Sequence, residues 1–284
     1  MNKFFVISNL NRDPECKIAG DIAEYLKSKG KSCDYIGIQR DDYDDSEAFE
    51  KINMIDNDTD CVLVLGGDGT IIQVSGVLAR KSLPIIGVNL GKLGFLAEVD
   101  KDKITDALDR LIADNYYYED RMMLSGTVVI NGCESESVYA FNDIVVKSRG
   151  NRVGYFELDV NGRRLTSISG DGIIAATPTG STAYSMSAGG AVVEPSSELI
   201  LVTPVCPVLS AARSIVLSAK DTVVIRVKKK DGHRPNKTTV FFDGGESYDL
   251  KPDDEVLIRR APENVRFVKL SKESFLDLLA RKMS

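Results

Sequence analysis

The chain has 284 residues, a formal net charge of −6, 43% hydrophobic residues and 27% charged residues, a composition typical of a globular protein. Its length allows one large domain or two medium ones, because single hydrophobic cores stop growing at roughly 250–300 residues. The acidic balance argues against nucleic-acid binding, which needs a basic face, and no apolar run approaches the ~20 residues that span a membrane.

The cysteines, the histidine and the first residues predict a cytoplasmic protein without a zinc or thiol site. The five cysteines are scattered and no two form a CxxC pair, which argues against a disulfide scaffold. The single histidine, His233, stands in a polar, basic stretch, where we expect a solvated surface residue. Only a short apolar stretch precedes the first charged residues, so no signal peptide is expected. The chemistry must come from carboxylates, hydroxyls and backbone groups.

The first hundred residues alternate strand and helix patterns. Asp13-Pro14 offers a helix cap followed by a proline at the first helical position, and Gly30 ends the helical spacing. The acidic stretch 41–60 predicts a solvated helix and loop. Strands are expected at 4–7, 33–38, 61–65 and 85–89, with a helical pattern at 71–78. This alternation predicts parallel βαβ units in a sheet that is covered on both faces.

Past residue ~115 strand patterns dominate, and Asn161-Gly162 between two of them predicts a hairpin. We therefore expect an α/β domain over residues 1–100 and a mostly β domain over 101–265, without a flexible linker. The expected strands of this second part, followed by a last helix at 274–282, are 126–130, 138–146, 155–160, 163–168, 198–204, 222–229, 238–243, 255–260 and 266–270.

The strongest local signal is the stretch LGGDGT, which follows an apolar strand and precedes a helical pattern. Its glycines let main-chain N–H groups approach a bulky anion, and the helix presents its positive end at the same place. The alternative is a tight turn with a capping aspartate, but Asp68 is flanked by Gly67 and Gly69, with Thr70 following. The loop matches neither the P-loop nor the GxGxxG pattern. We interpret it as an unusual phosphate cradle.

Two further sites carry polar groups where apolar residues would be expected. The stretch 177–187, TPTGSTAYSMS, is rich in small hydroxyls and glycine, which suit ribose hydroxyls and base edges. Asn142 and Asp143 stand within an otherwise apolar strand pattern, where an amide and a carboxylate are costly unless paired. They could equally satisfy a turn.

Together these motifs resemble the NAD kinase family. The resemblance spans most of the chain and rests on GGDGT, NLGKLGFL at 89–96, the Asn-Asp pair, DGIIAATPTGSTAYSMSAGG and TPVCPVLSAARSIVLS at 203–218. GGDGT is shared with lipid kinases and phosphofructokinases, so the TPTGSTAYS block is the specific part.

The resemblance implies a two-domain fold, an activity and a set of site residues. The last helix is expected to return to the N-terminal domain, with residues 266–284 packing on it, and the β-rich domain to bind NAD. The implied reaction transfers the γ-phosphoryl group of ATP to the 2′-hydroxyl of the adenosine ribose of NAD, giving NADP and ADP. Mg²⁺ or another divalent metal is expected to arrive with the substrate. Family members are homodimers or homotetramers.

The implied catalytic residue is Asp68, as proton acceptor. The implied nucleotide-binding residues are Gly67, Asp68, Gly69, Thr70, Phe95, Asn142, Asp143, Arg152, Ser169, Asp171, Thr182, Ala183, Tyr184, Ser185, Met186 and Ser187. The sequence departs from the family pattern at two positions: Asp143 stands where glutamate is more frequent, and Gly245 where glutamine is common.

The position of Asp68 creates a tension in this mechanism. A helix N-terminus stabilises an ionised carboxylate and makes it a weaker base. Because the transition state of phosphoryl transfer is loose, strong basicity is not required. Asp68 could therefore orient the hydroxyl or contact the metal. The alternatives for the whole protein are a GGDGT-type lipid kinase, which would need an apolar acceptor cleft, and a non-catalytic nucleotide sensor.

Overall fold

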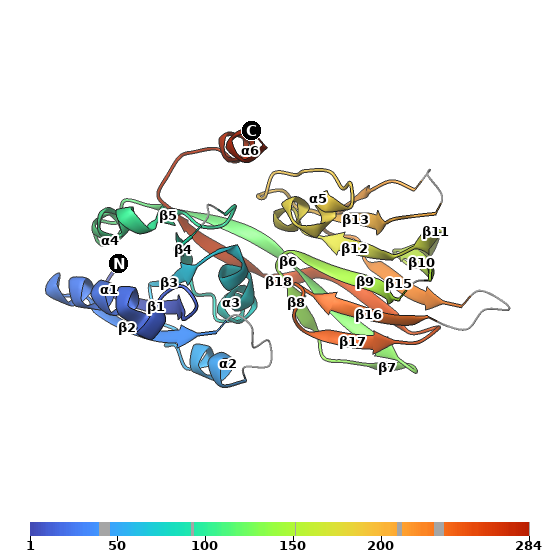
Figure 1. Ribbon diagram of the computed structural model, residues 1–284, viewed down its shortest axis with the longest axis horizontal. Coiled ribbons are helices and arrows are strands. Elements are labelled where there is room, and N and C mark those ends of the chain that lie inside the picture. Colours follow the sequence, from blue (N-terminus) through green and yellow to red (C-terminus); the bar gives the residue numbers. More distant parts are fainter. Residues whose placement is uncertain (40–45, 92–93, 151, 209–211, 230–235, 284) are drawn as a thin grey trace. The chain divides into compact units, whose positions relative to one another are not determined.

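The computed structural model describes residues 1–39, 46–91, 94–150, 152–208, 212–229 and 236–283 (Figure 1). The chain forms two compact units: unit 1 comprises 1–121 and 263–284, and unit 2 comprises 122–262. Strands β6 (Tyr117–Ile130) and β18 (Glu255–Lys269) each contain a boundary between the units. His233 lies outside the described residues. No helix in the described ranges is long and apolar enough to cross a bilayer.

Unit 1 is built on a parallel sheet with the strand order β2-β1-β3-β4. Every residue of β3 and β4 is buried, as expected for strands covered on both faces. The last part of β18 pairs in parallel with β4, and two 3₁₀ turns lie at Pro14–Cys16 and Lys101–Lys103. The other elements are β1 (Lys3–Asn9), α1 (Lys17–Ser28), β2 (Ser32–Ile38), α2 (Ser46–Asn53), β3 (Cys61–Gly66), α3 (Asp68–Arg80), β4 (Ile85–Asn89), β5 (Val99–Asp100), α4 (Ile104–Ile112) and α6 (Phe275–Met283).

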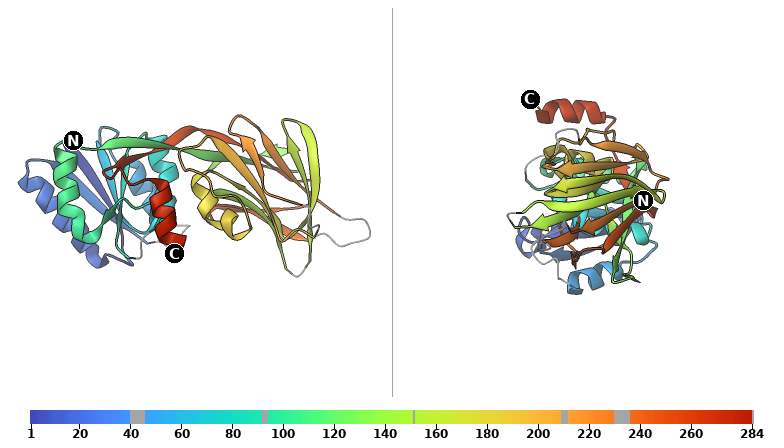
Figure 2. Two further views of the ribbon diagram at one scale, coloured as in Figure 1. Left: turned by 90° about the horizontal axis from the view of Figure 1, so that it is seen from above. Right: turned by 90° about the vertical axis from the view of Figure 1, so that its right-hand side faces the viewer.

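Helices α1 and α4 cover the same face of this sheet (Figure 2). Leu26 of α1 and Leu108 of α4 belong to one apolar cluster with alternate residues of the strands, such as Phe4 and Leu63. Because α4 packs in unit 1, the boundary between the units lies after Arg121, later than the position 100 expected from sequence. The expected boundary at position 100 did not take the helical pattern of α4 into account.

The start of α1 depends on the buried side chain of Asp13. Its carboxylate accepts the N–H of Ile18 at 2.8 Å and of Ala19 at 3.2 Å, and the hydroxyl of Ser8 at 2.7 Å. The expected cap is therefore present, but Pro14 opens a 3₁₀ turn and the α-helix itself begins at Lys17. Asp13 ties the end of β1 to the first turn of the helix.

Unit 2 contains two mainly antiparallel sheets that enclose one apolar core. One sheet has the order β11-β10-β15-β18 and the other the order β14-β13-β12-β9-β16-β17. Phe156 of β10 and Phe242 of β16 are buried members of the core, which draws on both sheets. The elements are β7 (Cys133–Glu134), β8 (Val138–Ala140), β9 (Asp143–Arg149), β10 (Gly154–Val160), β11 (Arg163–Gly170), β12 (Gly172–Ala176), a 3₁₀ turn Thr179–Thr182, α5 (Tyr184–Ser187), β13 (Leu199–Val205), β14 (Ile215–Ser218), β15 (Val223–Lys228), β16 (Lys237–Phe242) and β17 (Ser247–Leu250).

Three sequence expectations meet different outcomes in unit 2. The hairpin at Asn161-Gly162 is confirmed: both residues have positive φ and join β10 to β11. The strand expected at 138–146 is interrupted at Phe141 and Asn142, which separate β8 from β9. The two strands expected at 255–260 and 266–270 are one strand, β18, which continues through Pro262.

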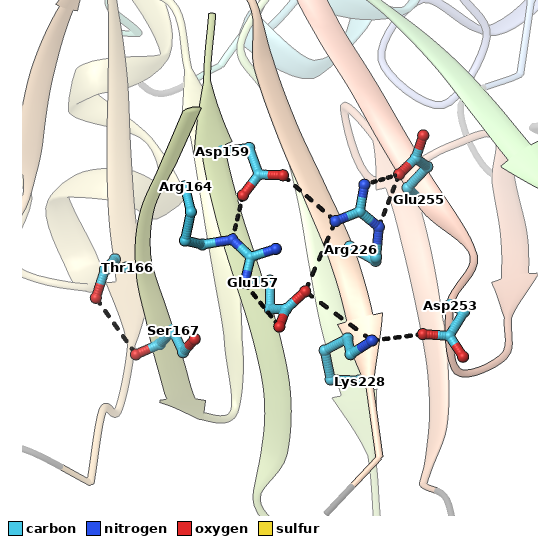
Figure 3. Close-up of polar contacts among 9 residues, drawn as sticks. All are labelled: Glu157, Asp159, Arg164, Thr166, Ser167, Arg226, Lys228, Asp253 and Glu255. Atoms are coloured by element: carbon cyan, nitrogen blue, oxygen red, sulfur yellow. Dashed lines mark hydrogen bonds and ion pairs between the residues drawn. The ribbon is translucent and has the colours of Figure 1, made fainter. Parts of the chain in front are cut away.

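The outer face of the β11-β10-β15-β18 sheet is charged (Figure 3). Arg226 stands opposite Glu157 on β10 and opposite Glu255 on β18, and its Nη2 lies 2.6 Å from Glu255 Oε2. Lys228 Nζ is 2.6 Å from Asp253 Oδ1 in the turn before β18. Apolar residues alternate with these charges along each strand, so the inward face builds the core and the outward face is polar.

Candidate nucleotide-binding and catalytic site

The GGDGT loop lies where β3 ends and α3 begins. Asp68 is the first residue of α3, and Gly67 stands at the N-cap with open space around the position of a Cβ atom. A Cβ at Gly66 would lie 2.4 Å from Thr70 Oγ1, so this position accepts only glycine. Thr70 is buried, and its hydroxyl accepts a hydrogen bond from Asn9 Nδ2 at 2.8 Å. The loop leaves the first turn of α3 open above Gly67, as an anion cradle requires.

The Asp68 carboxylate is held by the second glycine loop. Oδ2 accepts the N–H of Phe95 at 2.7 Å, and Oδ1 accepts the N–H of Leu96 at 3.2 Å. A Cβ at Gly94 would lie 1.8 Å from Asp68 Oδ1, so the approach depends on glycine there. Two amide donors stabilise the ionised carboxylate and fix its direction.

Asparagines at the carboxyl ends of β1 and β4 support both loops. Asn9 ends β1 and reaches Thr70, while Asn89 ends β4 and closes a turn by accepting the N–H of Gly91 at 3.0 Å. The N–H of Leu90 donates to the carbonyl of Gly66 at 2.9 Å, which ties the two loops together. Sequence reasoning named neither asparagine as a site residue, although a polar residue at the end of a buried strand is a signal that could have indicated them. Ligands of parallel sheets bind at this strand end.

Phe95 lies between the Asp68 carboxylate and the C-terminal helix. Its backbone N–H donates to Asp68, and Lys282 Nζ of α6 lies 4.7 Å from the centre of its ring. The expected return of the last helix to the N-terminal unit is therefore observed in this contact. Residues 92–93 of the same loop lie outside the described residues.

In unit 2, Asn142 and Asp143 lie at the break between β8 and β9, against Asp243. Asp143 is buried, and burial together with the neighbouring charge of Asp243 raises its pKa to about 7. Burial also raises the pKa of Asp243, to about 6, against the opposing effect of N–H groups of residues 141–143. The interpretation of the Asn-Asp pair as part of a turn and its interpretation as a ligand site are compatible, because the backbone makes the turn.

The hydroxyl-rich block divides into internal and exposed groups. Ser185 is fully buried, and its hydroxyl lies 3.1 Å from that of Thr203, so this predicted ligand group serves internal packing. Thr182 Oγ1 donates to the carbonyl of Thr179 at 3.2 Å. Thr179 Oγ1 is buried without a hydrogen-bond partner in the described part of the chain. Exposed or partly exposed members of the predicted set are Thr182, Ala183, Tyr184, Met186 and Ser187.

The structure does not bring Arg152, Ser169 and Asp171 next to Asn142. Asp171 precedes β12 and the TPTG turn follows β12. At 3.3–3.4 Å per residue along the strand, Asp171 and the start of this turn are about 20 Å apart. Arg152 and Asp171 lie near Ser148, which bonds to the carbonyl oxygens of both. Ser169 lines a separate pocket of about 400 Å³, whose other walls include Pro204, Pro207 and Ile215.

The described residues contain no group of three His, Cys, Asp or Glu side chains that could hold a metal ion. Gly245, which departs from the family pattern, donates its N–H to the carbonyl of Phe242 at 2.8 Å in the β16–β17 turn. In the same turn, Asp243 Oδ1 accepts the N–H of Asn142 at 2.7 Å.

A glycine cradle at the carboxyl end of a parallel sheet, joined to a β-rich unit with a polar turn, defines a two-unit nucleotide-dependent kinase class. The model of the ATP-NAD kinase N-terminal domain matches residues 13–116, and that of the ATP-NAD kinase C-terminal domain matches residues 142–270. The chain belongs to the ATP-NAD kinase family.

Individual relatives agree with this assignment. The chain is 36% identical to an NAD kinase of Lachnospira eligens, with 100% of both chains covered. Among solved structures, it resembles an NAD kinase from Archaeoglobus fulgidus in complex with ATP, with a TM-score of 0.77 and 26% identity over 98% of each chain. Its fold also resembles yeast NADH kinase complexed with NADH, with a TM-score of 0.83 and 23% identity over 100% of this chain and 89% of that chain.

Proposed function

We propose that the protein is an NAD kinase, which transfers the γ-phosphoryl group of ATP to the 2′-hydroxyl of the adenosine ribose of NAD. The observation that carries this proposal is the match of both domain models of the family, with 36% identity to a full-length relative of that name. The lipid-kinase alternative is not supported by these relatives, and the block after β12 is polar rather than apolar.

Unit 1 supplies the groups for the phosphoryl donor in this proposal. The amides of Gly67 and Gly69 and the N-terminus of α3 would bind phosphate oxygens. A divalent metal would arrive on the triphosphate and neutralise developing charge, with Asp68 available to one of its waters. The two oxygens of Asp68 already accept two amide hydrogens. We therefore assign Asp68 the role of orienting groups at the reacting centre rather than that of removing a proton.

Unit 2 supplies the groups for the acceptor. Asn142 offers a donor and an acceptor for an adenine edge, and the Asp143 carboxyl can hold ribose hydroxyls. Thr182 and the exposed part of α5 would add contacts, and Tyr184 of α5 is 36% exposed. Ser169 on β11, Arg152 before β10 and Asp171 before β12 do not lie next to Asn142, so we assign them to a different part of the ligand.

The first experiment is ATP-dependent NADP formation by the purified chain with Mg²⁺. Absence of NADP would refute the proposal. Asp68→Asn should lower kcat by more than about tenfold, because it removes a charge at the reacting centre. Asn89→Ala is the control, since it loosens the loop after β4 without touching the carboxylate. An equal loss in both variants would assign the effect to loop position.

A second experiment addresses the acceptor. Asn142→Ala should raise the KM for NAD and leave the KM for ATP unchanged; an unchanged KM for NAD would refute the adenine assignment. We also propose that the chain forms a homodimer or homotetramer and that it is located in the cytoplasm. The family resemblance implies the oligomer, and the scattered cysteines favour the cytoplasm. Light scattering coupled to size exclusion tests the oligomeric state.

A further inference from the structure

In the turn formed by residues 141–143, here called the 141–143 turn, each backbone N–H and carbonyl group forms a hydrogen bond with one of two distant residues, Asp243 or Thr177. Asp243 Oδ2 accepts the N–H of Phe141 at 2.6 Å, and Oδ1 accepts those of Asn142 at 2.7 Å and Asp143 at 3.0 Å. The N–H of Asp243 donates to the carbonyl of Asp143 at 3.0 Å. Thr177 donates its hydroxyl to the carbonyl of Phe141 at 2.6 Å and its N–H to that of Asn142 at 2.9 Å.

These six hydrogen bonds satisfy every backbone polar group of the turn. A strand would have received them from its neighbours in the sheet, but β8 ends at Ala140 and β9 begins at Asp143. The partners come instead from the end of β12 and from the turn after β16. Charge-assisted amide bonds of this kind are short and strong, and losing the acceptor would leave three donors unsatisfied.

Gly180 closes the turn on its other side. A Cβ at Gly180 would lie 2.0 Å from the carbonyl oxygen of Asn142, so the TPTG turn approaches the 141–143 turn as closely as backbone atoms permit. The N–H of Gly180 in turn donates to Thr177 Oγ1 at 3.0 Å. Thr177 thus connects the two motifs that sequence reasoning had kept separate.

With the backbone fixed in this way, the side chains of Asn142 and Asp143 are not used by the turn. Within the described ranges, neither side chain makes a hydrogen bond to another residue, although Asp143 is only 6% exposed. An amide and a carboxyl held at a fixed spacing by other residues are preorganised for a polar ligand.

We propose that Asp243 and Thr177 are positioning residues for acceptor recognition: they hold the 141–143 turn so that the side chains of Asn142 and Asp143 meet the adenosine part of NAD. This proposal rests on the proposed function of those two side chains. Asp243 and Thr177 act through the turn and do not touch the nucleotide. The expected signature is a change in the KM for NAD with little change in kcat.

The test uses Asp243→Asn and Thr177→Val in the full chain. Asparagine tolerates the positive φ of 50° at position 243, but its NH₂ group faces amide hydrogens instead of accepting them. Asp253→Asn is the matched control, because Asp253 also has a positive φ and binds Lys228 on the surface. Thr239→Val is the control for Thr177→Val, since it also removes a buried hydroxyl, one that donates to Asp249 at 2.7 Å and not to the 141–143 turn.

We expect Asp243→Asn to raise the KM for NAD by about tenfold or more and Thr177→Val by about threefold or more, with kcat and the KM for ATP within about threefold of wild type. The two controls should leave the KM for NAD within about twofold of wild type. A KM for NAD near wild type in both folded variants overturns the proposal. Equal losses for NAD and ATP overturn it too, because they indicate a general structural defect.

A double-mutant cycle separates positioning from simple destabilisation. If Asp243 acts through Asn142, then Asn142→Ala combined with Asp243→Asn raises the KM for NAD no more than the larger single effect. Full additivity refutes the proposal. If Asp243→Asn does not fold, the same cycle is run with Thr177→Val. Wild type that binds NAD by calorimetry but makes no NADP refutes only the proposed function, and the variants are then compared by Kd; wild type that binds no NAD refutes both.

Discussion

Replacing Asp143 by asparagine is expected to stabilise the protein at alkaline pH while weakening acceptor binding. The structure raises the pKa of Asp143 from 3.8 to about 7, first through burial and second through the charge of Asp243. A group with a raised carboxyl pKa holds its proton more tightly in the folded state, so stability falls as the pH rises from about 4 to 7. Asparagine does not ionise and removes this loss.

The size of the effect follows from linkage. A shift of about 3 units corresponds to at most about 4 kcal/mol at pH 8, of which roughly 2–3 kcal/mol develops between pH 5 and pH 8. At pH 5 the folded-state carboxyl is still protonated but that of the unfolded state is already ionised, so at most about 1–2 kcal/mol of the loss is present and the variant should exceed wild type by less than at pH 8. At pH 8 the variant should be more stable by an amount on the order of 1–3 kcal/mol.

The assay is urea unfolding followed by circular dichroism at pH 5 and pH 8, without nucleotide. The difference between variant and wild type is compared at the two pH values, so the titration of groups that do not interact with Asp143 cancels. Asp253→Asn is the control without pH dependence: Lys228 lowers the pKa of that exposed carboxyl, which is therefore ionised at both pH values, so the difference from wild type should be the same at pH 5 and pH 8. A stability difference for Asp143→Asn that is the same at both pH values, or that favours wild type at pH 8, would refute the reasoning.

Three further outcomes are expected. Gly94→Ala should lower kcat by about a hundredfold or more while the fold is retained, because a Cβ there would lie 1.8 Å from Asp68 Oδ1; kcat within about threefold of wild type would show that the carboxylate position is not critical. Asp13→Ala should lower the free energy of unfolding by about 1–3 kcal/mol, through loss of three hydrogen bonds at the start of α1, and urea titration measures it. The KM for NAD should fall as the pH rises through about 7 in wild type and stay flat in Asp143→Asn, since the ionised carboxyl accepts ribose hydroxyls.

Local sequence patterns predicted the elements of both units well. The runs at β1, β3 and β4 are apolar because both faces of these strands are covered, and Asn161-Gly162 adopts the positive φ values that its residue types favour. The glycine loop between β3 and α3 was predictable for the same reason. Each of these signals lies within a few residues of the structure that it specifies.

What the sequence did not reveal depends on pairing over long distances. Asp243 is a hundred residues from Asp143, and nothing in FFDGGE indicates that its carboxylate faces three amides. The pairing of Phe267 with Ile85, which places the end of β18 in unit 1, is likewise invisible to local periodicity. Two strands were expected where β18 runs continuously through Pro262, although proline usually ends a strand. The hydroxyls of TPTGSTAYS could not be divided into internal and exposed groups without their partners.

The course of β18 has a consequence for synthesis of the chain. Unit 1 lacks its last strand until residues 263–269 leave the ribosome, and Val268 is a fully buried member of its core. All of unit 2 has been translated by then, so it can fold before unit 1 is complete. A nascent chain that stalls after residue 262 would hold a finished β-rich unit beside an α/β unit with an open sheet edge. Exposed edges of that kind recruit other strands, so truncation at the C-terminus should cause aggregation more readily than point changes within unit 2.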